Sequence, residues 1–312
     1  SRKIVNEKIS DTSITIHSEV KFPLGENWFK KIDLLVISPG LSPHPEKYSG
    51  LAPMLKLAKN RGVPVFTEVD LFEIAINSSR NDIKIDKDFK NNNSKTSQII
   101  AVTGTNGKTS VVNLLTKLLS SLGIDAQCAG NTRPSLLEAV MHREKMNKQP
   151  DFWVLELSSF QLALTTSFSP TYSTILNFSQ DHLDWHRNEV EYLESKLKVF
   201  GVPFPSSQAL ICRDDKNLAT KIYEYIDSKL ANRNKKDILT FGYSNPDQKT
   251  GFGINSAEKF CYFDATKKIK YSEFPLEAKD LKLYGKHNYS NITFCLTLIS
   301  QITENFQSSL QT

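Results

Sequence analysis

A short glycine-containing loop between an apolar strand and an amphipathic helix constrains the fold of this chain more than any other feature. Residues 98–103 (QIIAVT) form an apolar run typical of a buried strand, and residues 109–122 place apolar side chains on one helical face. The segment that joins them, 103–110, reads TGTNGKTS. Glycines let the backbone curl with its N–H groups pointing inward, and the next helix adds the positive end of its dipole. This segment predicts a phosphate-binding loop.

The loop departs from the common G-x-x-x-x-G-K pattern. Val102 stands where that pattern has its first glycine, so the loop starts at Gly104 and is shorter. The chemistry is retained, because Lys108 can reach the β- and γ-phosphates of a nucleotide and a hydroxyl of Thr109 or Ser110 can bind magnesium. The alternative is a glycine-rich turn followed by a surface lysine.

Strands and helices alternate along most of the chain, which is typical of a parallel sheet covered by helices. Before the loop, we expect strands at 33–37 and 63–66, helices at 51–61 and 68–76, and a polar, Asn-rich linker at 77–97. After the loop, we expect strands at 152–157, 173–178, 208–212, 237–241, 251–254, 260–263 and 280–284, and helices at 190–200, 215–229 and 289–300.

Composition narrows the class of protein. The 312 residues suggest about two domains. The net charge of +5 (39 Lys and Arg against 34 Asp and Glu) does not by itself indicate a nucleic-acid binder. No apolar run approaches the roughly 18 residues of a membrane span, and the N-terminus lacks the pattern of a signal peptide. The cysteines are widely spaced, which predicts reduced, buried thiols rather than a zinc site: Cys128, Cys212, Cys261 and Cys295.

Several motifs together resemble the Mur ligase family, whose members join amino acids to cell-wall precursors and whose relatives include folylpolyglutamate and cyanophycin synthetases. Residues 102–110 (VTGTNGKTS) are similar to the ATP loop of that family. Residues 155–162 (LELSSFQL) and 175–186 (ILNFSQDHLDWH) resemble the following motifs of its D-glutamate-adding branch. Weaker matches are Ser38-Pro39-Gly40 with Glu68 and Leu71, and residues 285–291 (GKHNYSN).

The resemblance implies an α/β fold in which a partial Rossmann-like N-terminal domain precedes a P-loop-type central ATPase domain. The central domain has a mostly parallel sheet and a small antiparallel portion. We expect residues 1–95 to form the remainder of a UDP-substrate-binding domain plus linker, 96–287 the central domain, and 288–312 a helix leading toward a third domain. On this interpretation the chain is truncated at both ends and turns over negligibly by itself.

The resemblance also implies an activity in peptidoglycan precursor synthesis. ATP would activate the carboxylate of UDP-N-acetylmuramoyl-L-alanine as an acyl phosphate, and D-glutamate would then form the amide, with Mg²⁺ as cofactor. We expect a cytoplasmic monomer that does not bind nucleic acid and has no membrane span. Two alternatives stay open: a sibling Mur-type or folylpolyglutamate-type ligase, and a nucleotide-binding module without ligase activity.

The family motifs assign roles to individual residues. The catalytic residues implied are Lys108, Glu156, His182 and Lys196. The implied ATP-binding residues are Gly104, Thr105, Asn106, Gly107, Lys108, Thr109, Ser110, Asn288 and Asn291. The implied substrate-binding residues are Ser38, Asn131, Ser158, Ser159, Gln161 and His182. The implied metal ligands are Thr109, Glu156, His182 and, if it is carbamylated, Lys196.

Alternatives accompany these roles. Glu156 could instead form a salt bridge at the sheet edge, and Lys198 could replace Lys196. His182 could be structural, and Asn288 could be a helix N-cap. His186 is left undecided between a functional and a structural role, whereas His17, His44 and His142 are expected at the surface. The chain departs from the usual family residues at Ala129, Gln180 and Trp185.

Overall fold

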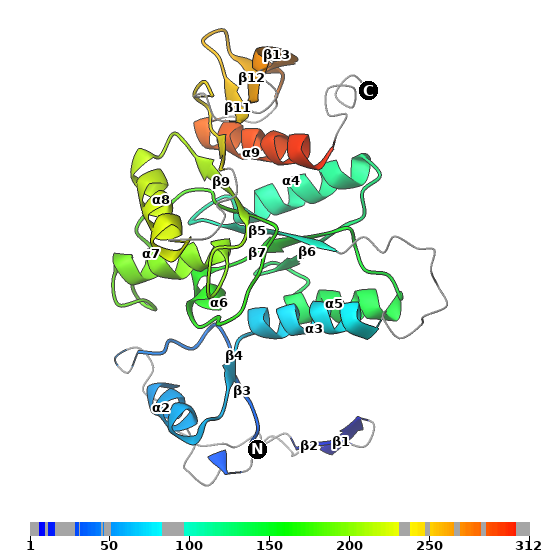
Figure 1. Cartoon of the computed structure of the whole chain (residues 1–312), viewed down its shortest axis with the longest axis vertical. Helices are drawn as coiled ribbons and strands as arrows, with labels where there is room; N and C mark the ends of the chain where they lie inside the picture. Colours follow the sequence, from blue (N-terminus) through cyan, green and yellow to red (C-terminus); the bar gives the residue numbers. More distant parts are fainter. Residues whose placement is uncertain are drawn as a thin grey trace.

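A computed structural model describes most of the chain, and its centre is one mixed sheet (Figure 1). The structure describes residues 6–9, 12–15, 29–30, 32–44, 46, 51–82, 97–230, 238–246, 250–264, 269–281 and 285–303. In these ranges the nine-stranded sheet has the order β13-β12-β11-β10-β9-β8-β5-β7-β6.

The sheet is parallel except at one edge. The parallel strands are β5 (Gln98–Thr103), β6 (Ala126–Gly130), β7 (Phe152–Glu156), β8 (Tyr172–Ile175), β9 (Gln208–Cys212), β10 (Leu239–Phe241) and β11 (Gly251–Ile254). The strands β12 (Lys259–Asp264) and β13 (Ile269–Glu277) extend it antiparallel. The predicted fold class, a mostly parallel sheet with a small antiparallel part, is therefore confirmed.

Helices cover both faces of the sheet (Figure 1). On one face lie α4 (Lys108–Ser121) and α9 (Lys286–Ile302), which bury apolar side chains against alternate residues of β5 such as Ile100 and Val102. The other face carries α3 (Glu68–Asp82), α5 (Leu136–Lys145), α7 (Glu189–Leu197) and α8 (Lys216–Leu230). Because both faces are covered, the central strands have apolar, buried residues at successive positions, as at 99–102 in β5 and 152–155 in β7.

The N-terminal segment contains two small pairs of strands. A parallel pair, β3 (Leu35–Val36) and β4 (Val65–Phe66), is connected through α2 (Leu51–Arg61), and β1 (Asn6–Ile9) pairs antiparallel with β2 (Thr12–Thr15).

The helix α3 connects this segment to the central sheet. Its residues Val69, Phe72 and Ile76 are buried in the same core as the central strands. The Asp70 carboxylate accepts hydrogen bonds from the backbone N–H groups of Thr166 and Ser167, both at 2.8 Å. The division into domains at residue 95 stays a prediction.

Two local predictions were wrong. The linker expected from residue 77 begins as helix, because α3 continues through Asp82; residues 83–96 lie outside the described residues. The strand expected at 280–284 does not begin at residue 280, because that residue ends a 3₁₀ turn, η2 (Ala278–Asp280). The turn follows the longer strand β13, and β13 itself was not predicted from the sequence. Residues 282–284 of that expectation lie outside the described residues.

The cysteines agree with the prediction of reduced, mostly buried thiols. None of the four forms a disulfide, and Cys212, Cys261 and Cys295 are buried while Cys128 is half-buried. Among the described helices, none is long and apolar enough to cross a membrane.

Candidate functional site

The phosphate loop lies where β5 ends and α4 begins. Gly107 adopts the left-handed conformation (φ 81°), and no side chain caps the helix that follows. The first helical hydrogen bond runs from the Val111 N–H to the Gly107 carbonyl, so the N–H groups of Lys108, Thr109 and Ser110 have no partner within the helix. Such N–H groups at a helix N-terminus form an anion site.

Two lysines converge on this loop. The Lys108 Nζ donates to the carbonyls of Gly104 and Thr105, both at 2.9 Å, and the Lys196 Nζ donates to the same Gly104 carbonyl at 2.9 Å. Lys196 is 2% exposed and lies 4.6 Å from the ring centroid of Tyr192. Burial, assisted by the charge of Lys108, lowers the pKa of Lys196 to about 7. Two lysine amines thus meet at the carbonyl of Gly104 in the loop.

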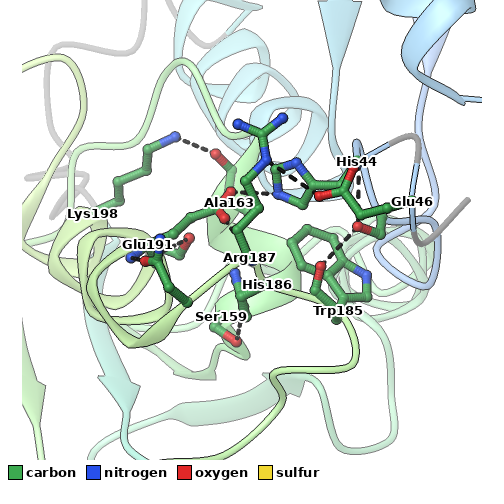
Figure 2. A network of polar contacts seen from close by, with 12 residues as sticks. His44, Glu46, Ser159, Ala163, Trp185, His186, Arg187, Glu191 and Lys198 are labelled. Carbon is green, nitrogen blue, oxygen red and sulfur yellow. Dashed lines mark hydrogen bonds and ion pairs between the residues drawn. The ribbon is translucent and has the colours of Figure 1, made fainter.

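The alternative lysine points elsewhere. The Lys198 Nζ donates to the carbonyls of Ala163 and Thr165, as Figure 2 shows for Ala163. Of the two candidates, Lys196 is therefore the one that faces the phosphate loop.

Glu156 ends β7 next to the loop, because Val102 and Glu156 are partners in the β5–β7 register. Glu156 as a whole is 1% exposed. Its Oε1 accepts a hydrogen bond from the Asn131 side chain at 3.0 Å, whereas Oε2 is buried and has no partner within the described ranges. The alternative of a salt bridge is not seen in that part of the chain. An unpaired buried carboxylate oxygen is costly, and a cation at this position would satisfy it.

His182 lies in the loop after β8, in the left-handed conformation (φ 55°). Its backbone N–H donates to Asp181 Oδ1 at 2.8 Å, and its ring packs edge-on against Phe160 with centroids 4.7 Å apart. The side chain is 41% exposed. Three His, Cys, Asp or Glu side chains do not meet at one cation site anywhere in the described residues. A metal at Glu156 would therefore need ligands other than these side chains.

The serines of the LELSSFQL motif mainly organise α6 (Ser159–Ala163). Ser158 caps the helix, since its Oγ accepts from the Gln161 N–H at 3.2 Å while Gln161 Oε1 accepts from the Ser158 N–H at 3.0 Å. Ser159 is buried, and its Oγ lies 3.0 Å from His186 Nε2. The structure thus gives these two serines structural contacts, and leaves Gln161 at a pocket wall.

A pocket lies between the N-terminal segment on one side and α6 with the loop after β8 on the other. It brings Ser38 and Gln161 of the predicted substrate-binding set together. Its walls are apolar and aromatic with few polar groups: Ile37, Ser38, Pro39, Leu41, Thr67, Glu68, Phe160, Gln161, Leu164 and Trp185.

A polar network beside the pocket holds the N-terminal loop against α7 (Figure 2). His44 Nε2 lies 2.6 Å from Glu191 Oε1, and the Ser42 hydroxyl donates to the Trp185 carbonyl at 2.8 Å. His44 is 6% exposed, so the expectation that it lies at the surface was wrong; the partner that buries it is 147 positions away in sequence. His142 is exposed, and His17 lies outside the described residues.

His186, whose role the sequence left undecided, lies in the interior and contacts the Ser159 hydroxyl. It is fully buried, and burial lowers its pKa to about 4, so its ring is neutral at pH 7.

The two asparagines near the C-terminal end differ in position. Asn291 is 8% exposed and lies over the loop, because a Cβ on Gly107 would stand 3.1 Å from its Nδ2. Asn288 lies in the first turn of α9, whose N-cap is Gly285, so the N-cap alternative was wrong.

One residue of the site was missed by sequence reasoning. The Asn177 side chain hydrogen-bonds both backbone groups of Asn106. The available signal was its place two residues after the end of β8, at the edge where α/β sites form.

The fold and the site together define a nucleotide-binding α/β domain with a phosphate loop at the carboxyl edge of a parallel sheet. The model of the Mur ligase middle domain matches residues 102–299. The chain therefore belongs to the Mur ligase family, as the motifs predicted.

Similar proteins include ligases of known name. A UDP-N-acetylmuramoylalanine–D-glutamate ligase of Nitrosomonas europaea is 32% identical over 291 residues, which are 92% of this chain and 54% of the relative. A ligase of the same name from Burkholderia thailandensis is 35% identical over 223 residues, covering 72% of this chain and 40% of the relative. The chain thus spans about half the length of the curated relatives it matches.

A solved structure shares the fold. A UDP-N-acetylmuramoyl-L-alanyl-D-glutamate–2,6-diaminopimelate ligase superposes with a TM-score of 0.56 at 22% identity, over 91% of this chain and 60% of that one.

Proposed function

We propose that the chain forms the ATP-binding part and a portion of the substrate-binding part of a ligase that adds D-glutamate to UDP-N-acetylmuramoyl-L-alanine. The observation that carries the proposal is the buried Glu156 oxygen without a partner in the described residues, beside a loop that holds two lysine amines. The names of the relatives support the choice of substrates. The site would act in the cytoplasm.

The nucleotide phosphates would bind the N–H groups of the first turn of α4. Lys108 would leave the loop carbonyls of Gly104 and Thr105 and turn to the β- and γ-phosphates, where its charge stabilises the negative charge of the transferring group. Asn291, next to Gly107, would meet the nucleotide from the side of α9. The whole loop, residues 104–110, would form this subsite together with Asn288.

Glu156 would hold magnesium through its unpaired oxygen, together with Thr109, His182 and nucleotide oxygens. Magnesium, when bound, neutralises charge on the phosphates. Lys196 would join this set after carbamylation, which requires the uncharged amine; its lowered pKa makes that form abundant near neutral pH.

The acceptor would occupy the pocket that contains Ser38 and Gln161 and reach toward Asn131 and His182. Its carboxylate would take the γ-phosphoryl group of ATP to give an acyl phosphate and ADP. The D-glutamate amine would then attack, forming the amide and releasing phosphate and a proton.

The nucleotide part of this proposal can be tested on the chain itself. Calorimetric titration with MgADP should show saturable binding, and Lys108→Ala should weaken it. Lys117→Ala, on the same helix but exposed at its outer face, is the matched control. Equal affinity of wild type and Lys108→Ala would contradict the assignment of the loop.

The ligase part is tested on the product of the uninterrupted reading frame. Phosphate release is measured with ATP, UDP-N-acetylmuramoyl-L-alanine and, in turn, D-glutamate, meso-diaminopimelate and L-lysine. Release should require D-glutamate. Release that requires meso-diaminopimelate and ignores D-glutamate would favour the sibling ligase instead.

A further inference from the structure

The phosphate loop is joined to the loop that follows β8 by the side chain of Asn177. Asn177 Oδ1 accepts a hydrogen bond from the Asn106 N–H at 2.9 Å, and Asn177 Nδ2 donates to the Asn106 carbonyl at 3.0 Å. In addition, the Asn177 carbonyl accepts from the Thr105 N–H at 3.1 Å. One residue thus satisfies three backbone groups of the phosphate loop.

The contact requires a side-chain amide. A planar amide carries a donor and an acceptor side by side, so it can pair with the N–H and C=O of one residue as a neighbouring strand would. A carboxylate of the same shape offers only acceptors. Asn106 is exposed, so water could hydrate its backbone groups in the absence of Asn177. The main effect of the Asn177 side chain is therefore to fix the conformation of the phosphate loop, and not to pair backbone groups that would otherwise be buried without a partner.

A second contact joins the same two loops. The Thr105 hydroxyl donates to the Ser179 carbonyl at 3.2 Å, and the Ser179 N–H lies 3.1 Å from the same hydroxyl oxygen. Three residues further on, the chain reaches His182. The position of the phosphate loop and the position of the His182 loop are thus fixed relative to each other.

We propose that Asn177 is a positioning residue that holds the phosphate loop in its nucleotide-binding shape and couples it to the His182 loop. This inference rests on the proposed function, in which the first loop binds phosphates and the second contributes to the magnesium site. Because Asn177 occupies the Asn106 N–H and its carbonyl occupies the Thr105 N–H, the phosphates would bind the N–H groups that follow Asn106 in the loop and the first turn of α4.

Asn177→Ala removes both side-chain hydrogen bonds, and Asn177→Asp retains the acceptor while placing a carboxylate against the Asn106 carbonyl. Both variants should bind MgADP about tenfold more weakly than wild type, and the enhancement of ADP affinity by magnesium should shrink. Asn217→Asp, an exposed position on α8, gives the same charge change as a control and should bind as wild type does. Thermal unfolding checks that the variants fold.

A second measurement does not depend on nucleotide binding. Without nucleotide, hydrogen exchange of the backbone N–H of Asn106 should accelerate in Asn177→Ala, because its acceptor, Asn177 Oδ1, is removed. The exchange rate should change less in Asn177→Asp, which keeps an acceptor oxygen. Wild-type affinity and an unchanged magnesium effect in both Asn177 variants would overturn the inference, as would unchanged exchange at Asn106. Absence of MgADP binding by the wild type would instead overturn the proposed function.

Discussion

Asn131 and Glu156 are joined twice, by side chain and by backbone. The Asn131 Nδ2 donates to Glu156 Oε1 at 3.0 Å, and the Asn131 N–H donates to the Glu156 carbonyl at 2.7 Å. This pairing orients the carboxylate so that its remaining oxygen is the one without a partner in the described part of the chain. In the proposed function, that oxygen is the one that would bind magnesium.

Replacing Glu156 by glutamine should abolish the effect of magnesium on nucleotide affinity. Glutamine keeps the shape, and its oxygen can still accept from Asn131, but its other atom becomes an NH₂ group that cannot bind a cation. We expect MgADP affinity to fall at least about tenfold, with ADP affinity in EDTA unchanged. Glu224→Gln, exposed on α8, is the control. Retention of the magnesium effect in Glu156→Gln would exclude Glu156 as a ligand.

Lys196 should form a carbamate in a pH-dependent manner. Only the neutral amine attacks CO₂, and burial has lowered its pKa to about 7, so the reactive form is minor at pH 6 and dominant at pH 8. With ¹³C-labelled bicarbonate, a carbamate carbon resonance should appear at pH 8 and weaken at pH 6. Lys196→Arg should lack it. A resonance that persists in Lys196→Arg would assign the carbamate to another lysine.

The sequence indicated the phosphate loop and the parallel sheet because both depend on local patterns. Residues 208–212 were predicted with the bounds that the structure shows, since an apolar run covered on both faces is a strong signal. The pairing of His44 with Glu191 and the contact of Asn177 with Asn106 were not predicted. These contacts join residues 147 and 71 positions apart, and no local pattern specifies which polar side chains meet across such distances.

His186 should make the folded state sensitive to acid. Its pKa falls from 6.5 to about 4 on folding, so the unfolded chain binds the proton more tightly. Above about pH 6.5 the ring is neutral in both states, so it does not lower the free energy of unfolding. That free energy falls as the pH drops from 6.5 toward 4. We expect wild type to lose about 1–2 kcal/mol more than His186→Gln between pH 7 and pH 5, measured by urea unfolding. His142→Gln, exposed on α5, should behave like wild type. Identical acid sensitivity in His186→Gln and wild type would exclude His186 as the titrating group.

Gly130 should not tolerate a side chain, because an added Cβ would combine backbone strain with a steric clash. Comparison with Gly123 separates these two contributions. Its φ is +122°, and an added Cβ would stand 2.1 Å from the Glu156 carbonyl oxygen, so Gly130→Ala must displace the strand end that carries Glu156. Gly123 has φ +76° with no atom within 4 Å of an added Cβ, so Gly123→Ala carries the backbone strain alone.

We therefore expect a destabilisation of about 1 kcal/mol for Gly123→Ala and at least about 2 kcal/mol more for Gly130→Ala, measured by urea unfolding. Gly130→Ala should also weaken the magnesium-dependent part of ADP binding, because displacement of β7 moves the unpaired Glu156 oxygen. Gly123→Ala should leave that binding unchanged, since it lies at the far end of α4. Equal stability losses in the two variants would show that β7 can shift at little cost to make room for a side chain at position 130. The close approach of Gly130 to the Glu156 carbonyl would then not be what positions the carboxylate.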